Sequence, residues 1–335
     1  MSLVYFKEDG WIFLKDFLAK QRAIILCDSN TKVCLELLYE SCPETENLPV
    51  IEIIAGEENK KLSTCEKVWE ELIELEADRG TILLNLGGGV VTDLGGFVAS
   101  SYMRGIRFVQ IPTSLLGMVD AAIGGKTGVD FSGLKNMVGV FARAEAVLID
   151  SDFLHTLPPR HYQNGLAEVL KHAFISDRTI LDLIEGDKDE LISRSVQVKM
   201  DVVKRDELEK GERKKLNFGH TIGHAIESHL LNSENPVLHG EAIAAGMIME
   251  TCISHRTVGL SIDQMKSITT KVDSVFPRIS LSESDWKSIK KLLVHDKKNR
   301  DGNVQFVLLN GMNEAVVDQS VSEELLDAAF NFYAS

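Results

Sequence analysis

The sequence predicts an α/β N-terminal domain with a mostly parallel, Rossmann-like sheet, followed by a mainly α-helical C-terminal domain. As far as residue 151, short apolar runs alternate with stretches of helical apolar spacing, the pattern of strands joined by helices. From residue 152 onward, helical spacing dominates. The chain has 335 residues, and single cores stop growing at about 250–300 residues. We therefore expect domains at 1–151 and 152–335, with Pro158-Pro159 marking entry into the second.

The N-terminal domain should contain five strands. Residues 23–27, 50–54, 81–86, 107–111 and 146–149 are β-branched or leucine-rich runs that end near Asp, Gly or Pro. Residues 32–39, 63–78 and 92–102 have the apolar spacing of helices. In such a sheet, ligands bind at the carboxyl ends of the strands.

The C-terminal domain should be built mainly from helices. Helical spacing covers residues 161–174, 180–184, 190–204, 218–231, 241–258 and 285–293. One hairpin is expected from residues 304–309 and 314–317, turned by Asn310-Gly311. A closing helix runs from residue 322 to the end.

Charge and composition exclude several classes of function. The net charge of −14 argues against nucleic acid and acidic membranes as partners. No apolar run approaches the roughly 20 residues of a membrane helix, and the first ten residues do not resemble a signal peptide. The five cysteines form no C-x-x-C pair, which predicts free thiols in a reducing cytoplasm.

A glycine-rich stretch at residues 84–96 is the first candidate site. A strand leads into Gly87-Gly88-Gly89 and then into a helix. Glycines permit close backbone approach, and the helix start offers unpaired N–H groups to a phosphate. A tight turn between strand and helix explains the glycines equally well. The G-x-G-x-x-G spacing is absent, so an ordinary dinucleotide fingerprint is excluded.

A second candidate follows the strand at residues 107–111. Gly124-Gly125-Lys126-Thr127 resembles part of a P-loop, but the frame fails because Asp120 stands where the first glycine belongs. Lys126 and Lys135 on a glycine-rich loop are typical of a phosphate site, and solvated lysines are the alternative.

A metal site is the third candidate. His220 and His224 are spaced i, i+4 on one predicted helix face, His239 opens the next helix, and Glu168 lies on an apolar helix. Two imidazoles and one carboxylate with open positions are typical of catalytic zinc. Buried histidines with ordinary hydrogen bonds are the alternative, and spacing does not decide between His220 and His224. HExxH is absent, which excludes a zincin.

Further polar residues have meaning only if they converge in space; separately, each is typical of exposed surface. They are Lys199, Glu209, Arg213 and Asn217, followed much later by Lys297 and Lys298.

Taken together, these runs resemble the 3-dehydroquinate synthase family. The motifs are G-G-G-V-V-T-D, P-T-S-L-L, G-G-K-T-G-V, L-K-N, G-L-A-E-V-L-K-H, N-F-G-H-T-I-G-H-A-I-E, L-H-G-E-A and H-D-K-K, in the family's order from about Ala23 to Glu314. The resemblance implies a homodimeric enzyme that uses NAD and zinc, or cobalt. It implies a small sugar-phosphate substrate, a heptulosonate 7-phosphate, converted to 3-dehydroquinate and phosphate in the shikimate pathway.

The resemblance also implies roles for individual residues. It matches Glu168, His220 and His239 to the metal ligands, His224 to a catalytic acid/base and Glu209 to a proton acceptor. The groups around the substrate's hydroxyls and carboxylate match Asp120, Lys171, Lys199, Arg213 and Asn217. The phosphate pocket matches Lys126, Asn136, Lys297 and Arg104, with Arg104 contributed by the partner subunit. The NAD site matches Asp28, Asn30, Glu57, Lys60, Gly88, Gly89, Val90, Asp93, Thr113, Ser114, Lys126, Lys135 and Thr156.

Three other functions compete with this interpretation. Related cyclases make 2-deoxy-scyllo-inosose or 2-epi-5-epi-valiolone, but Lys199, Arg213, Leu216, Asn217 and His224 resemble the set that reads a carboxylate. A polyol dehydrogenase would not need the phosphate-binding lysines. A metal-binding module without catalysis would not need the acid, base and phosphate groups. The loaded metal, any larger assembly, and the choice between Lys297 and Lys298 at the phosphate stay open.

Overall fold

The computed structural model describes residues 2–132, 134–231, 233–293 and 304–335. Contacts within the chain divide it into two compact units, Met1–Tyr162 and Gln163–Ser335. The division falls inside one helix, α5 (Pro159–Ile175), and the expected boundary after residue 151 is retained as a proposal. Among the described residues, no helix has the length and apolar content needed to cross a membrane.

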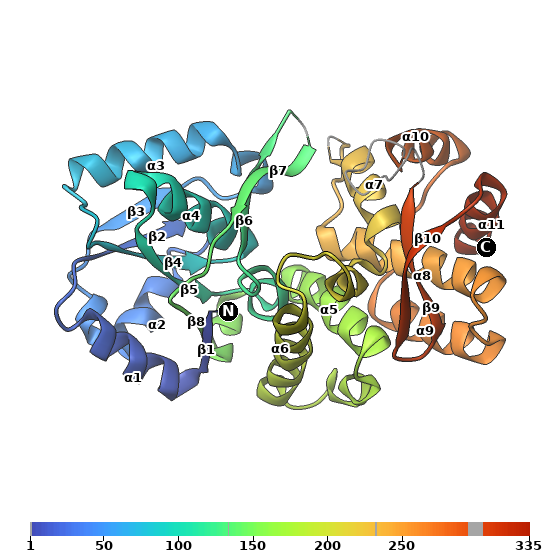
Figure 1. Ribbon diagram of the computed structural model, residues 1–335, viewed down its shortest axis with the longest axis horizontal. Helices are drawn as coiled ribbons and strands as arrows, with labels where there is room; N and C mark the ends of the chain where they lie inside the picture. Colours follow the sequence, from blue (N-terminus) through green and yellow to red (C-terminus); the bar gives the residue numbers. More distant parts are fainter. Residues whose placement is uncertain (1, 133, 232, 294–303) are drawn as a thin grey trace. The chain divides into compact units, whose positions relative to one another are not determined.

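The first unit contains a six-stranded, wholly parallel sheet in the order β1-β8-β5-β4-β2-β3 (Figure 1). This confirms the predicted α/β fold class. Its strands are β1 (Leu3–Phe6), β2 (Ala23–Asp28), β3 (Val50–Ile53), β4 (Ile82–Gly87), β5 (Arg107–Pro112) and β8 (Ala146–Ile149). Its α-helices are α1 (Lys7–Leu18), α2 (Cys34–Ser41), α3 (Leu62–Glu74) and α4 (Gly89–Ser101).

Helices cover both faces of this sheet. Ile24 and Leu26 of β2 belong to one buried cluster with Val68 of α3 and Leu94 of α4. Figure 1 shows α1 and α2 on the opposite side of the sheet from α3 and α4. Because both faces are covered, the strands are apolar throughout rather than alternating.

Three parts of the fold were not expected from the sequence. β1 and α1 precede the first predicted strand, and β1 forms the edge of the sheet beside β8. The stretch interpreted as a phosphate loop forms an antiparallel hairpin of β6 (Lys126–Phe131) and β7 (Leu134–Phe141). In the second unit, helix α9 (Ile262–Val275) follows α8.

The second unit is mainly helical, as predicted. Besides α5 and α9, its helices are α6 (Lys188–Arg205), α7 (His220–Leu230), α8 (His239–Thr257), α10 (Glu283–Leu293) and α11 (Glu323–Ala334). The expected hairpin is present as β9 (Gln305–Gly311) and β10 (Glu314–Ser320). The largest deviation among predicted helices is residues 180–184, of which 180–183 lie in a short 3₁₀ segment, Arg178–Leu183.

Helices α7 and α8 are packed backbone to backbone. A Cβ at Gly246 of α8 would lie 2.0 Å from the carbonyl oxygen of Gly219, the residue before α7. Gly219 itself has φ +80, which glycine adopts without strain. Buried Glu250 of α8 accepts hydrogen bonds from the N–H groups of Gly219, at 2.7 Å, and Ile222, at 3.2 Å. This carboxylate thus caps α7, whose own N-cap residue has no side chain.

Candidate metal and substrate site

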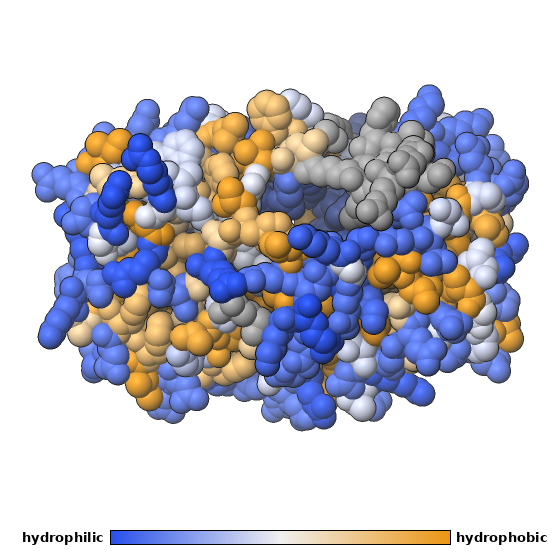
Figure 2. All heavy atoms as spheres, in the orientation of Figure 1, coloured by the Kyte–Doolittle hydropathy of each residue, from blue (hydrophilic) through white to orange (hydrophobic). Residues whose placement is uncertain are grey.

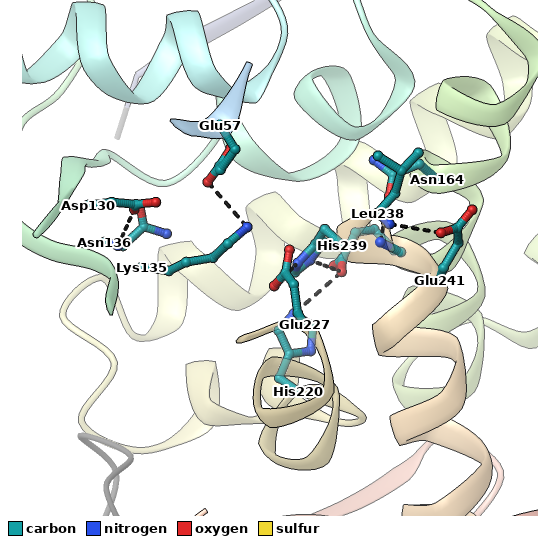
Figure 3. Close-up of polar contacts among 12 residues, drawn as sticks. Glu57, Asp130, Lys135, Asn136, Asn164, His220, Glu227, Leu238, His239 and Glu241 are labelled. Atoms are coloured by element: carbon teal, nitrogen blue, oxygen red, sulfur yellow. Dashed lines mark hydrogen bonds and ion pairs between the residues drawn. The ribbon is translucent and has the colours of Figure 1, made fainter. Parts of the chain in front are cut away.

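Three helices of the second unit bring Glu168, His220 and His239 together. Glu168 lies on α5 with a fully buried side chain, while His220 and His239 are the first residues of α7 and α8. The Nε2 atoms of both histidines lie 3.4 Å from Oε1 of Glu168. Figure 3 shows the two imidazoles at the adjoining ends of their helices. The three ligand atoms lie within 4.8 Å of one another.

The outer nitrogen of each imidazole has an acceptor beside it. Nδ1 of His220 lies 3.1 Å from the carbonyl oxygen of Phe218, and Nδ1 of His239 lies 3.4 Å from Oε2 of Glu227. An N–H at each Nδ1 satisfies these acceptors, so each Nε2 faces Glu168 and offers a lone pair to a metal when the imidazole is neutral. Each Nε2 lies 3.4 Å from the Glu168 oxygen, a contact that either a proton on the imidazole or a bound cation stabilises. Tetrahedral zinc, with bonds of about 2.0–2.1 Å, spaces its ligands by about 3.3–3.4 Å, so these residues fit a divalent metal.

The electrostatics of the site agree with a cation at this position. Burial acts against the charged carboxylate of Glu168, but Lys171 and His220 outweigh it and hold the pKa of Glu168 well below its usual value. Burial lowers the pKa of His220 to about 4. Burial also acts against a charged His239, but the carboxylates of Glu227 and Glu168 outweigh it and raise its pKa to about 9. A metal ion that enters this site therefore displaces a proton.

His224 lies beside these ligands on α7. Its ring centroid is 5.2 Å from that of His220 and 5.9 Å from that of His239. His224, Glu227 and His239 form a second group whose possible ligand atoms lie within 4.8 Å of one another. The first group has the buried carboxylate between two Nε2 atoms, so its geometry favours His220 over His224 as a ligand.

Three basic residues of the second unit are buried, and one of them contacts a proposed metal ligand. Lys171 of α5, Lys199 of α6 and Arg213 are all buried, in a chain whose net charge is −14. Lys171 Nζ donates a hydrogen bond to Oε2 of Glu168. Burying cations costs free energy unless anionic or polar groups balance them, and a set of this kind is typical of a site for an anionic ligand.

Glu209 and Asn217 are joined directly. The Asn217 amide donates to Oε1 of Glu209 at 2.6 Å. Glu209 has φ 58, a left-handed conformation that costs free energy for any residue other than glycine. The loop that holds it is anchored by Arg213, which donates to the carbonyl oxygen of Glu207 at 2.6 Å. The loop therefore fixes the position of a carboxylate at a strained residue, a feature common at functional sites.

The proposed nucleotide-binding residues of the first unit gather at the carboxyl edge of the sheet. Asp28 ends β2, and its carboxylate accepts from the N–H groups of Asn30 at 2.9 Å and Thr31 at 2.8 Å. Adjacent strands β4 and β5 lead directly to the other groups. Gly88 precedes α4, Gly89 and Val90 begin it, and Thr113 and Ser114 follow β5.

Four charged residues near this edge form a connected network. Lys60 Nζ lies 2.7 Å from Oδ2 of Asp93 and 3.6 Å from Oε1 of Glu57. The same Glu57 oxygen lies 3.3 Å from Lys135 Nζ (Figure 3). Burial acts against the charge of Lys60, but Asp93, Glu57 and Asp130 outweigh it and raise its pKa above the usual value. The network holds Lys60 protonated at the end of the sheet.

The residues expected at the phosphate lie in the β6–β7 hairpin and in a short 3₁₀ segment, Tyr102–Arg104. Asn136, at φ 50, donates its N–H to Asp130 Oδ1 at 2.7 Å in the β6–β7 hairpin, and Lys126 begins β6. Arg104 has φ 70. Asp120 lies in a short π-helical segment, Gly117–Ala121. Two predicted residues remain. The hydroxyl of Thr156 donates to the Phe153 carbonyl at 2.9 Å. Lys297 lies outside the described residues, as does Lys298.

Two buried carboxylates near the metal ligands escaped the sequence analysis, Glu227 and Glu250. A signal for Glu227 was present, because it lies one turn after His224 on the same helix face. Glu250 had no comparable signal, because its contacts with α7 depend on helix packing.

The sequence matches two family models and many curated relatives. A family model described as 3-dehydroquinate synthase N-terminal matches residues 50–164, and one described as 3-dehydroquinate synthase C-terminal matches residues 165–299. A 3-dehydroquinate synthase of Parabacteroides distasonis is 39% identical over 332 residues, which cover 96% of this chain and 94% of the relative.

Solved structures of similar fold include two sugar-phosphate cyclases. A 2-epi-5-epi-valiolone synthase from Streptomyces hygroscopicus, with NAD⁺ and Zn²⁺ bound, has a TM-score of 0.86 at 27% identity, covering 100% of this chain and 97% of that one. A 2-deoxy-scyllo-inosose synthase complexed with carbaglucose-6-phosphate, NAD⁺ and Co²⁺ has a TM-score of 0.83 at 26% identity, covering 97% and 95%.

Proposed function

The chain belongs to the 3-dehydroquinate synthase family, and from this premise we propose how its residues carry out the reaction. The enzyme converts 3-deoxy-D-arabino-heptulosonate 7-phosphate to 3-dehydroquinate and phosphate, a step of the shikimate pathway. It uses NAD and a divalent metal, zinc or cobalt. A transient oxidation is followed by β-elimination of phosphate, reduction, ring opening and an intramolecular aldol step.

Glu168, His220 and His239 hold the metal. The observation that carries this role is the position of Glu168 Oε1, 3.4 Å from the Nε2 atoms of both histidines. When bound, the metal supplies Lewis acidity to a substrate hydroxyl, and NAD supplies the hydride acceptor. Because the hydride returns to the substrate, NAD is not consumed.

The protein's side chains bind the substrate and move protons. Glu209 accepts a proton, supported by its fixed position beside Asn217, and His224 serves as acid/base beside the metal ligands. Lys171 and Asp120 complete the catalytic set. The substrate's carboxylate, hydroxyls and phosphate are bound by Lys199, Arg213, Asn217, Lys126, Asn136, Lys297 and the partner subunit's Arg104.

Phosphate release tests the proposed function. The purified protein is incubated with the heptulosonate phosphate and NAD at a concentration far below that of the substrate. We expect many phosphates released per NAD, no net NADH, and loss of the reaction after treatment with a chelator. Stoichiometric NADH would instead indicate a dehydrogenase, and absence of phosphate release from metal-loaded protein would contradict the proposal.

We propose a homodimer, supported by apolar residues at the surface of the β6–β7 hairpin. Phe131, Met137, Val140 and Phe141 are 41–52% exposed, and Figure 2 shows hydrophobic atoms at the surface of the unit that contains this hairpin. Exposed clusters of this kind mark protein interfaces. Phe141→Asp is expected to give a monomer by light scattering, with Ile73→Asp on α3 as an exposed apolar control outside the hairpin. A Phe141→Asp protein that remains dimeric would exclude the hairpin as the interface.

We also propose a cytoplasmic location. All five cysteines are free and buried, as expected of a protein that folds in a reducing compartment. Fractionation of the source cells, with an antibody to the protein, tests this location.

A further inference from the structure

Glu227 is a buried carboxylate for which the proposed reaction gives no role. It lies on α7 with 2% of its surface exposed. Its Oε2 lies 3.4 Å from Nδ1 of His239, which belongs to a different helix, α8. Figure 3 shows the carboxylate pointing toward the imidazole. A buried carboxylate is costly unless its surroundings use the charge, so this contact calls for an explanation.

The contact determines which nitrogen of His239 faces the metal position. A carboxylate has no proton to donate when ionised, so the imidazole must carry its N–H on Nδ1. When His239 is neutral, as it is in a metal ligand, the lone pair is then on Nε2, which lies 3.4 Å from Oε1 of Glu168. If the ring were turned or its tautomer reversed, an N–H would face Glu168 and no lone pair would be available to a metal.

The two histidine ligands differ in how they are held. His220 has a backbone carbonyl beside its Nδ1, that of Phe218, only two residues away. His239 has a charged acceptor from another helix, and charge-assisted hydrogen bonds are stronger than neutral ones. Carboxylate–histidine pairs of this kind orient metal ligands in many metalloproteins. Glu227 thus also links α7 to the first residue of α8.

We propose that Glu227 is a positioning residue for the metal site, holding His239 in the tautomer and orientation that present Nε2 to the ion. This inference rests on the proposed metal ligands and deepens them. It assigns Glu227 no proton transfer and no contact with substrate. Its loss should therefore weaken metal binding, and saturating metal should restore most of the activity.

Metal affinity of the apoprotein tests this role in Glu227→Ala and Glu227→Gln variants. Competition with a chelator of known affinity for Zn²⁺ gives the Kd of each. Loss of an outer partner of this kind weakens metal binding by about 10–100-fold, and we expect a change of this size for the alanine variant. The glutamine variant retains an oxygen acceptor without the charge, so its Kd should lie between those of alanine and the original protein.

Glu241→Gln is the matched control. Glu241 lies in the first turn of α8, and its carboxylate accepts from the Leu238 N–H at 2.8 Å. The substitution removes the same charge near the ligands while keeping an acceptor for this N–H. We expect its Kd for Zn²⁺ to stay within about twofold of the original value, because a twofold change is small beside the 10–100-fold loss expected at an outer partner.

Visible spectra of the Co²⁺ forms provide a second readout. The bands of tetrahedral Co²⁺ should shift or weaken in both Glu227 variants and not in Glu241→Gln.

If Glu227→Ala does not fold, the Zn²⁺ affinity and Co²⁺ spectrum of Glu227→Gln alone test the inference. A Zn²⁺ Kd within about twofold of the original in the folded variant, with an unchanged Co²⁺ spectrum, would contradict the inference. Activity lost despite saturating metal would also contradict it, because Glu227 would then act through His224. Failure of the proposed function would give a different result from failure of this inference, because the unsubstituted protein itself would then bind metal without releasing phosphate.

Discussion

His220→Ala is expected to lower kcat/KM by about 10³-fold and to leave the purified protein without bound metal. A metal contributes several kcal/mol of transition-state stabilisation as a Lewis acid, and about 1.4 kcal/mol corresponds to a factor of ten in rate. His220 is buried and lies at the start of α7. Its removal leaves Glu168 and His239, and two ligands do not retain a divalent ion in this geometry.

Metal analysis and steady-state kinetics check this result together. His229→Ala is the control, because His229 lies on the same helix and pairs with Asp285 at 2.8 Å. This variant should keep about one metal per chain and kcat/KM within about twofold. If His220→Ala retains stoichiometric metal, the ligand set must be revised toward His224, Glu227 and His239.

Glu209→Gln is expected to lower kcat by about 10²–10⁴-fold, the usual contribution of a general base. Glutamine is close in size and can still accept from Asn217, which donates to Oε1 at 2.6 Å. The loop should therefore persist, and metal content and thermal stability should not change. Loss of kcat without loss of metal separates this variant from His220→Ala.

Glu212→Gln is the control for Glu209, because Glu212 lies in the same connection and pairs with Arg205 at 2.8 Å. Stopped-flow measurements of NADH formation locate the affected step. Full activity of Glu209→Gln in this assay would remove Glu209 from the catalytic set.

Local patterns predicted most of the fold. The five expected strands, 23–27 to 146–149, are all present in the parallel sheet. β1 was missed because α1 follows it directly, without a separating turn. Helix α9 had a readable signal in Ser261 and Gln264, which form a capping box.

The β6–β7 hairpin shows where sequence patterns are ambiguous. Its glycines were attributed to phosphate binding, but a Cβ at Gly125, just before β6, would lie 2.9 Å from the carbonyl oxygen of Ala142, just after β7. Glycine there permits close approach of two backbones. Sequence alone gives no means of distinguishing a backbone neighbour from a phosphate, since both exclude a side chain.

The metal site depended on contacts between distant segments. Helical spacing put His220 and His224 on one face of α7 and could not choose between them. The resemblance to the family identified His220 as the ligand. The structure gives a physical reason, because Nε2 of His220 lies 3.4 Å from Oε1 of Glu168 on α5. The role of Glu227 could be recognised only in the structure, because its partner, His239, belongs to the next helix.

The glycine contact between α7 and α8 bears on the entropy of metal binding. Gly219 and Gly246 leave no room for the helices to slide, and both helices begin with a proposed ligand. The conformational entropy of His220 and His239 is thus lost when the protein folds and not when the ion binds. The site is therefore preorganised for the metal. Metal affinity should consequently follow the stability of the helix pair, and a substitution far along α8 that loosens it would weaken binding without touching a ligand.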